Sequence, residues 1–232
     1  SRVVAWTPSG HGPRAAATDG IAGAATPSEA VRGADLVVLA APPLACLDLV
    51  DLLGGPLRDE LTGDAVVTDV ASTKATLVER ARAAGVRFVG GHPLAGRETS
   101  GYGAADPVLL RGRPWVVVPS EPADAAADER VTDLATACGA RPVRMSAAAH
   151  DATVAAISHL PLVLSAALVE AMAAEPDWPV ARDLAAGGWA SMTRLARGDA
   201  AMGAGILATN GPAVAERLMA LRAVLDDWFA AL

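Results

Sequence analysis

The side chains best suited to chemistry lie in a glycine-rich segment, residues 90–101, which follows a short apolar strand at 87–89. His92 stands there among glycines and is followed by Pro93. An imidazole titrates near neutral pH, so His92 can exchange a proton under physiological conditions. Glycine lets a backbone approach a ligand closely and adopt positive φ, and proline fixes the turn. We therefore expect a ligand-binding turn with His92 as general base; the alternative is a surface turn with an incidental histidine.

Two further segments carry polar side chains in suggestive places. Ser72 and Lys74 lie where a strand at 65–68 gives way to a helix at 73–84, and His159 lies in a long apolar helix. Lys74 opposes the dipole at the start of its helix, so we expect an anion beside it, either Asp69 or a ligand. On the residues alone, Ser72 could equally be a helix cap, and His159 a buried core histidine.

In this order, residues 69–74, 90–101, 157–161 and 187–194 resemble the prephenate/arogenate dehydrogenase family of tyrosine biosynthesis. The resemblance covers nearly the whole chain. It implies an oxidoreductase that uses NAD or NADP for the oxidative decarboxylation of prephenate to 4-hydroxyphenylpyruvate. Arogenate (cyclohexadienyl) dehydrogenase is the nearest alternative. The resemblance also implies a homodimer formed through the helical domain.

The resemblance assigns roles to individual residues. His92 matches the family's catalytic histidine, and Ser72 matches a serine that hydrogen-bonds to that histidine and to the substrate or nicotinamide. Arg194 matches an arginine that binds a substrate carboxylate, a task suited to a guanidinium because it donates two parallel hydrogen bonds. The implied substrate-binding residues are His159, Arg194, Gly187, Gly188, Glu98 and Arg97. The expected cofactor-binding residues are Thr7, Ala41, Pro42, Pro43, Ser72 and Lys74.

The choice between prephenate and arogenate depends on Glu98. Arogenate carries an ammonium where prephenate carries a keto group, and a buried ammonium needs a carboxylate partner. Glu98 matches an acidic residue at the family's pocket mouth, but Arg97 stands beside it in place of an expected small hydroxyl residue and competes for it. We therefore expect a cationic pocket that favours the dianion prephenate.

The cofactor choice rests on the strand at residues 2–6. In a dinucleotide-binding domain, an acidic residue near the end of the second strand binds the adenosine ribose of NAD. Here Thr7, Pro8 and Ser9 follow the strand and Arg14 is near, so NADP or dual use is plausible alongside NAD. We expect no metal, because the four histidines and two cysteines lack paired ligand spacing.

Strand and helix patterns alternate through the first part of the chain, which is typical of a Rossmann-like, doubly wound parallel sheet. After about residue 146 only helical patterns remain. We therefore expect a dinucleotide-binding domain at 1–145 and an all-helical substrate-binding and dimerisation domain at 146–232. Residues 2–6 resemble the family's second strand, so we expect the first strand and its Gly-rich loop to be absent from this chain. The expected strands are 2–6, 35–41, 65–68, 87–89, 115–118 and 141–144.

Two long helices are expected in the second domain. One covers residues 147–174 with a kink at Pro161, and the other begins after Gly211-Pro212. The last helix carries one apolar stripe, which either packs on its own domain or forms a dimer seam. The stripe consists of Val214, Leu218, Leu221, Leu225, Trp228 and Leu232.

Composition narrows the possible partners. The chain is 52% hydrophobic and 19% charged, with a net charge of −7, which argues against nucleic acid or an anionic membrane as partner. Apolar runs are broken by charge, proline or glycine before the roughly 18 residues that a membrane span needs, so we expect no membrane partner. Two isolated cysteines favour a cytoplasmic protein.

Two rival hypotheses remain open. A β-hydroxyacid dehydrogenase would favour a catalytic lysine in the helical domain, but Lys74 is the only lysine of the chain. A non-catalytic dimerising or sensing module that lacks the cofactor loop is the rival from another class.

Overall fold

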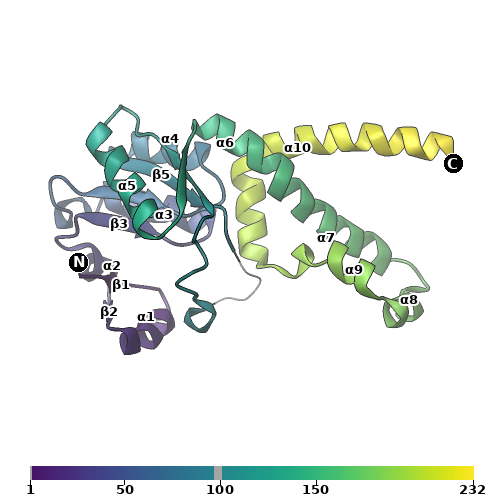
Figure 1. Ribbon diagram of the computed structural model, residues 1–232, viewed down its shortest axis with the longest axis horizontal. Coiled ribbons are helices and arrows are strands. Elements are labelled where there is room, and N and C mark those ends of the chain that lie inside the picture. Colours follow the sequence, from purple (N-terminus) through teal and green to yellow (C-terminus); the bar gives the residue numbers. More distant parts are fainter. Residues whose placement is uncertain (1, 97–100) are drawn as a thin grey trace.

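The computed structural model describes residues 2–96 and 101–232, which form an α/β part and a helical part joined near residue 146 (Figure 1). Two strands, β1 (Val4–Ala5) and β2 (Ala22–Gly23), pair in parallel. A separate five-stranded sheet has the order β3-β4-β5-β6-β7. Its strands are β3 (Leu36–Leu39), β4 (Val66–Asp69), β5 (Phe88–Pro93), β6 (Pro114–Val118) and β7 (Arg141–Arg144).

Helices cover both faces of the five-stranded sheet. On one face, α3 (Pro43–Gly54) and α4 (Ala75–Ala83) bury a core that includes Val50 and Leu77; on the other, α5 (Ala125–Ala137) buries Val131 against the sheet. Near the N-terminus, α1 (His11–Ala16) packs on β2, and Thr26 caps α2 (Pro27–Val31) as its capping-box sequence predicts. The Rossmann-like α/β fold expected from the alternating pattern is confirmed.

The sheet differs from the expected all-parallel arrangement in one pair. Strands β5 and β6 run antiparallel, with His92 opposite Val116, whereas the other pairs are parallel. Parallel neighbours need a long crossover, usually a helix. In the described part of residues 94–113 the chain forms only the 3-10 turn Tyr102–Ala104, so it returns beside β5 in the opposite direction.

The expectation of a turn at residues 90–93 is wrong, because these residues continue β5. A Cβ atom on Gly91 would lie 2.4 Å from the carbonyl oxygen of Asp69, and one on Gly90 would lie 3.1 Å from Lys74 Cδ. Neither glycine has positive φ. The two glycines therefore serve close packing of β5 on β4 and α4, and they leave His92 at the end of a rigid strand.

The helical part starts with a continuous 27-residue helix, Ala147–Ala173. It consists of α6 (Ala147–Val154), a π-helical turn (Ala155–His159) and α7 (Leu160–Ala173). The irregularity precedes Pro161 instead of lying at it, and π turns of this kind are frequent at functional sites. Pro161 fits without a break because it occupies the first turn of α7.

Three further helices complete the helical part: α8 (Trp178–Leu184), α9 (Gly187–Met192) and α10 (Ala200–Ala231). The last of these consists of two helices joined at a kink at Asn210, whose φ and ψ are −134° and 18°. Its second half therefore begins close to the start expected after Gly211-Pro212, and its first half begins at Ala200. The kink places Pro212 in the first turn of the second half of α10, where a missing N–H costs little.

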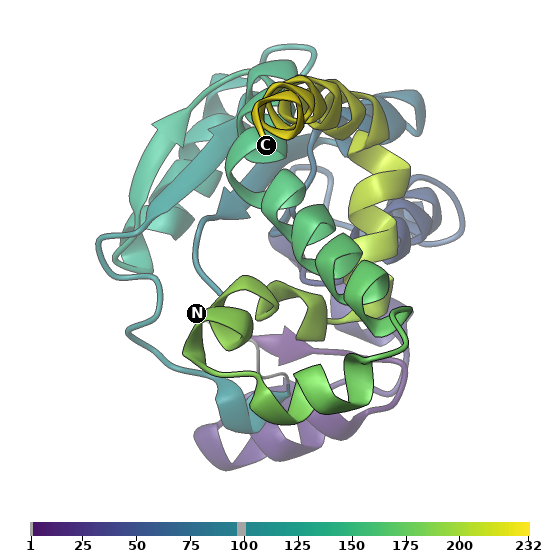
Figure 2. The same cartoon turned by 90° about the vertical axis from the view of Figure 1, so that its right-hand side faces the viewer.

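The second half of α10 extends away from the rest of the chain in Figure 1, and Figure 2 shows it nearly end-on. Val214 is buried, but Leu225, Trp228 and Phe229 are 47%, 67% and 81% exposed. By length and composition, helix Ala147–Ala173 could also cross a membrane, with a mean hydropathy of 1.9 and 22% of the window buried. The lengths of the apolar runs in the sequence did not indicate such a helix, because they were counted as broken at proline. In the structure neither His159 nor Pro161 ends the helix. The helical part thus presents much apolar surface.

Candidate active site

The candidate site lies where the α/β and helical parts meet. Strand β4 ends at Asp69, α4 starts at Ala75, and β5 ends just beyond His92. The helix α6 brings His150 and Asp151 to the same place. Ligands of doubly wound sheets bind outside the carboxyl ends of the strands, which is the edge that this cluster occupies.

A buried ion pair forms the floor of the site. The Asp69 carboxylate accepts hydrogen bonds from the N–H groups of Gly91 (3.0 Å) and Ala71 (2.9 Å), and it also binds the Lys74 ammonium. Both charged side chains have no exposed surface. The predicted anion beside Lys74 is thus Asp69. The ammonium of Lys74 is thus paired within the chain, and its role in cofactor binding stays a prediction.

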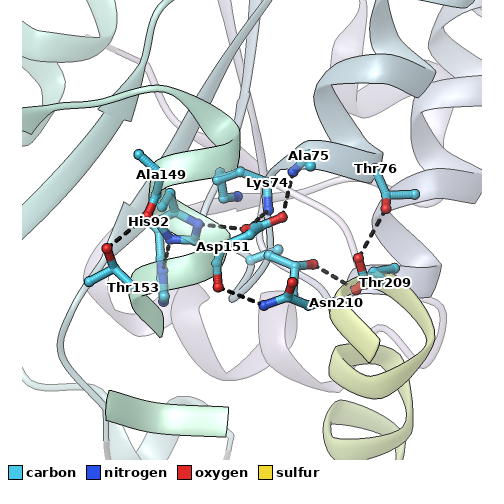
Figure 3. Close-up of polar contacts among 12 residues, drawn as sticks. Lys74, Ala75, Thr76, His92, Ala149, Asp151, Thr153, Thr209 and Asn210 are labelled. Carbon is cyan, nitrogen blue, oxygen red and sulfur yellow. Dashed lines mark hydrogen bonds and ion pairs between the residues drawn. The ribbon is translucent and has the colours of Figure 1, made fainter. Parts of the chain in front are cut away.

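The carboxylate of Asp151 joins the two parts of the chain. It accepts hydrogen bonds from the N–H groups of Lys74 (2.8 Å) and Ala75 (2.9 Å), so a residue of α6 caps α4 (Figure 3). Burial alone would raise the pKa of Asp151, but hydrogen bonds from His150, Ala75 and Lys74 outweigh it and hold the pKa below its ordinary value. Asp151 is therefore an anion at neutral pH.

His92 and His150 are in direct contact. His92 Nδ1 lies 2.8 Å from His150 Nε2, and His150 Nδ1 lies 2.7 Å from Asp151 Oδ1. His150 has no exposed surface, whereas His92 remains partly exposed. Burial, together with repulsion from Lys74 and from the neighbouring imidazoles of His150 and His159, lowers the pKa of His92 well below its ordinary value. His92 is therefore neutral at pH 7, as a general base must be.

His159 occupies the π-helical turn and is fully buried. The side-chain amide of Asn210 donates to the carbonyl oxygen of Asp151 (2.9 Å) and contacts His159 Nδ1 (3.1 Å). Because an amide NH₂ only donates, His159 Nδ1 accepts and its proton lies on Nε2. That nitrogen has no hydrogen-bond partner among the described residues. Burial, reinforced by His150 and opposed by Asp151, lowers the pKa of His159 to about 4.

The loop that carries Ser72 is held against α10. Ser72 Oγ lies 3.8 Å from Met202 Sδ, and the hydroxyls of Thr73 and Thr209 are 2.8 Å apart. Thr76 donates to the carbonyl oxygen of Thr209 over 3.1 Å (Figure 3). Ser72 does not cap α4, since Lys74 precedes that helix and Asp151 accepts from its first N–H groups. The cap alternative for Ser72 is therefore wrong.

The predicted residues of α9 and the following turn lie on the helical part. Gly187 and Gly188 begin α9 and are exposed, as is Arg194. The turn after Arg194 is anchored on α7, because Ala196 N–H donates to the buried Ser165 Oγ over 2.9 Å. Ser165 is six residues beyond His159, roughly 9 Å along a helix at its usual rise. Arg97 and Glu98 lie outside the described residues.

The predicted cofactor residues lie at strand ends. Ala41, Pro42 and Pro43 follow β3, and Thr7 follows β1. Thr7 lines a cavity of about 480 Å³ with Gly10, Arg14 and others. Its Oγ1 atom is buried and has no hydrogen-bond partner in the part of the chain that the structure describes. Thr7 thus places a buried hydroxyl that lacks a partner among the described residues beside this cavity.

Sequence reasoning missed two members of the cluster. His150 was expected only to cap or pair at a helix start; it does pair with Asp151, but it also reaches His92. Asn210 was noted only as the single asparagine of the chain, in a segment already suspected, and was given no role. Within residues 2–96 and 101–232, no group of three His, Cys, Asp or Glu side chains could hold a metal ion.

Comparison with known proteins identifies the family. A family model described as "Prephenate dehydrogenase, nucleotide-binding domain" matches residues 7–144, and one described as "Prephenate dehydrogenase, dimerization domain" matches residues 146–230. The chain belongs to the prephenate dehydrogenase family.

Individual relatives agree with this assignment. Prephenate dehydrogenase of Bacillus subtilis is 31% identical over 202 residues, which are 85% of this chain and 52% of the relative. Cyclohexadienyl dehydrogenase of Zymomonas mobilis is 29% identical over 209 residues, 88% of this chain and 67% of the relative. The chain spans about half the length of the B. subtilis relative.

Solved structures show the same fold. Prephenate dehydrogenase from Aquifex aeolicus, in complex with hydroxyphenyl propionate and NAD⁺, has a TM-score of 0.87 at 26% identity. The superposition covers 98% of this chain and 80% of the A. aeolicus chain. Arogenate dehydrogenase from Synechocystis has a TM-score of 0.78 at 28% identity, with coverages of 99% and 82%.

Proposed function

We propose that the protein catalyses the NAD(P)-dependent oxidative decarboxylation of prephenate to 4-hydroxyphenylpyruvate. The observation that carries this proposal is the neutral imidazole of His92 at the junction of the two parts of the chain, held by His150 and close to His159. Family membership supports the reaction class, and the relatives named prephenate dehydrogenase support the substrate.

Different residues of the chain transfer the proton and bind the charged groups of the substrate. When bound, the nicotinamide supplies the hydride acceptor. His92 takes the proton of the ring hydroxyl as hydride leaves the ring carbon that bears this hydroxyl. After carbon dioxide departs, His92 returns the proton to the phenolate oxygen of the product. No proton is therefore gained or lost overall. Ser72 hydrogen-bonds to the same hydroxyl, His159 donates from its unpartnered Nε2–H, and Arg194 binds a substrate carboxylate.

We place the cofactor along the ends of β1, β3 and β4. Thr7 binds the adenosine ribose through its unsatisfied hydroxyl, and residues 41–43 and Ser72 line the path toward His92. The cavity lining includes no carboxylate, and the guanidinium of Arg14 folds over the turn to donate to the Ser9 carbonyl oxygen (3.2 Å). This lining accepts a 2′-phosphate as well as a hydroxyl, which supports NADP alongside NAD.

We also propose a cytoplasmic homodimer formed through the helical part, with the boundary between the domains at 145/146 and neither nucleic acid nor membrane as partner. The match to a dimerization domain and the exposed apolar end of α10 support the dimer. The same contact gives the apolar surface of Ala147–Ala173 a protein neighbour in place of lipid.

The substrate is tested by measuring kcat/KM of the full-length protein for prephenate and arogenate, with NAD and with NADP, before and after Glu98→Gln. We expect a preference for prephenate that Glu98→Gln leaves in place. A preference for arogenate that collapses in Glu98→Gln would assign Glu98 to the ammonium and overturn prephenate as substrate. No turnover of either substrate would favour the non-catalytic module.

A further inference from the structure

Three side chains form a continuous line of hydrogen bonds from α6 into the site. Asp151 Oδ1 lies 2.7 Å from His150 Nδ1, and His150 Nε2 lies 2.8 Å from His92 Nδ1. The line crosses from the helical part to the sheet, because His150 lies on α6 and His92 lies on β5. The two histidines are 58 residues apart in sequence. The rings of the two histidines meet edge to face, with centroids 5.0 Å apart and planes at 71°.

The direction of these hydrogen bonds follows from the chemistry of their ends. Asp151 is ionised and can only accept, so the proton between it and His150 belongs to His150 Nδ1. In the imidazole tautomer that has its proton on Nδ1, the lone pair of His150 Nε2 accepts from His92. His92 must therefore carry its proton on Nδ1, which leaves the lone pair of its Nε2 on the side away from His150.

We propose that His150 is a positioning residue that, together with Asp151, fixes the tautomer of His92 in which Nε2 is free to take the substrate's proton. This inference rests on the proposed role of His92 as the base. The same bond also stabilises the imidazolium that forms during turnover, because His92 Nδ1–H still donates to His150 when Nε2 is protonated.

The surroundings leave His150 no competing partner. Its side chain has no exposed surface, so water does not compete for either ring nitrogen. Four other groups face the line from neighbouring elements: the buried Lys74–Asp69 pair at the start of α4, and His159 with Asn210 from the helical part. Asn210 donates to the backbone of Asp151 and to His159, so its amide leaves the carboxylate to His150 and α4.

The line also depends on how the two parts of the chain dock. Asp151 accepts from the first N–H groups of α4, at 2.8 and 2.9 Å, while it accepts from His150. The contact that seats α6 on α4 is thus the contact that orients His150. His92 becomes a correctly oriented base only when the helical part is in place.

Two substitutions of His150 separate hydrogen bonding from packing. Gln can accept from His92 through its oxygen and donate to Asp151 through its nitrogen, whereas Phe keeps the ring volume and can do neither. We expect His150→Phe to lower kcat about 10- to 100-fold with little change in KM, and His150→Gln to restore most of the loss. Val154→Ala, one turn later on α6 and equally buried, is the matched control; it loses packing but no side-chain hydrogen bond and keeps kcat.

The tautomer itself is measured by ¹⁵N NMR of the imidazoles, which needs no turnover. The chain has four histidines, so single substitutions assign every signal. We expect His92 to be protonated on Nδ1 at neutral pH in the wild type and in His150→Gln. Protonation of His92 on Nε2 in the wild type would overturn the inference, as would an unchanged kcat in His150→Phe. If the protein fails to turn over prephenate, the proposed function falls, and the NMR result still decides the tautomer.

Discussion

The substitution Asp151→Asn tests how strongly α6 is joined to α4. The carboxylate accepts three hydrogen bonds, from Lys74 N–H, Ala75 N–H and His150 Nδ1. Lys74 and His150 share Oδ1, and Ala75 alone uses Oδ2. An asparagine therefore places its oxygen at the Oδ1 position, where it keeps two bonds, and turns its NH₂ group toward the N–H of Ala75.

The cost follows from these bonds. A hydrogen bond to a charged group contributes about 1 kcal/mol more than one to a neutral group, so the two retained bonds lose about 2 kcal/mol together. The N–H of Ala75 loses its partner at a partly buried position, which costs about 1 kcal/mol more. We expect Asp151→Asn to lower the free energy of unfolding by about 3 kcal/mol.

Urea denaturation, followed by far-UV circular dichroism, measures this loss. The control is Asp124→Asn at the cap of α5, where the side chain accepts from Ala127 N–H (3.0 Å) and pairs with the half-buried Arg87. A helix cap and a half-exposed ion pair each contribute about 1 kcal/mol or less. A loss in Asp151→Asn no larger than that of the control would refute the account of Asp151 as the joint between the two parts.

The other predictions concern the base, the substrate, pH and assembly. His92→Asn is expected to lower kcat by roughly 10²- to 10⁴-fold while cofactor binding, followed by fluorescence titration, stays intact; near-normal turnover would remove His92 as base. Arg194→Ala should weaken substrate binding by about 2 to 5 kcal/mol, and an unchanged KM would make Arg194 a surface residue. Because the pKa of His159 falls from 6.5 unfolded to about 4 folded, its contribution to stability is complete above pH 6.5 and lost as pH drops toward 4. At about 1.4 kcal/mol per pKa unit this loss is about 3 kcal/mol, and denaturation curves at several pH values should show that His159→Gln removes it. Replacing both Trp228 and Phe229 with Glu should convert the proposed dimer to a monomer in sedimentation experiments, and an unchanged mass would place the interface elsewhere.

Local sequence patterns predicted much of this molecule. Alternating apolar strands and capped helices fix the α/β order, because each pattern depends on neighbouring residues. His92 and Ser72 could be singled out as candidate site residues because each lies in a short motif, and their roles stay predictions. The role of Gly90 and Gly91 could not, since it depends on the positions of Asp69 and Lys74 in space.

The contacts across the domain junction could not be predicted from the sequence. His150 looked like a helix-start residue because its neighbour Asp151 explains it locally, and only the fold brings it to His92. The last helix could be expected to start after Gly211-Pro212, but the sequence does not show that Asn210 leaves helical geometry and that its amide contacts Asp151 and His159. Both residues act through partners more than 50 positions away.

The central claim is that His92 serves as the base in oxidative decarboxylation. The most direct measurement incubates the full-length protein with prephenate and NAD or NADP, and quantifies reduced nicotinamide, carbon dioxide and 4-hydroxyphenylpyruvate for the wild type and for His92→Asn. The account predicts equal amounts of the three products from the wild type and a loss of all three, by a common factor, in His92→Asn. Reduced nicotinamide without carbon dioxide, or equal product formation by both proteins, would contradict it.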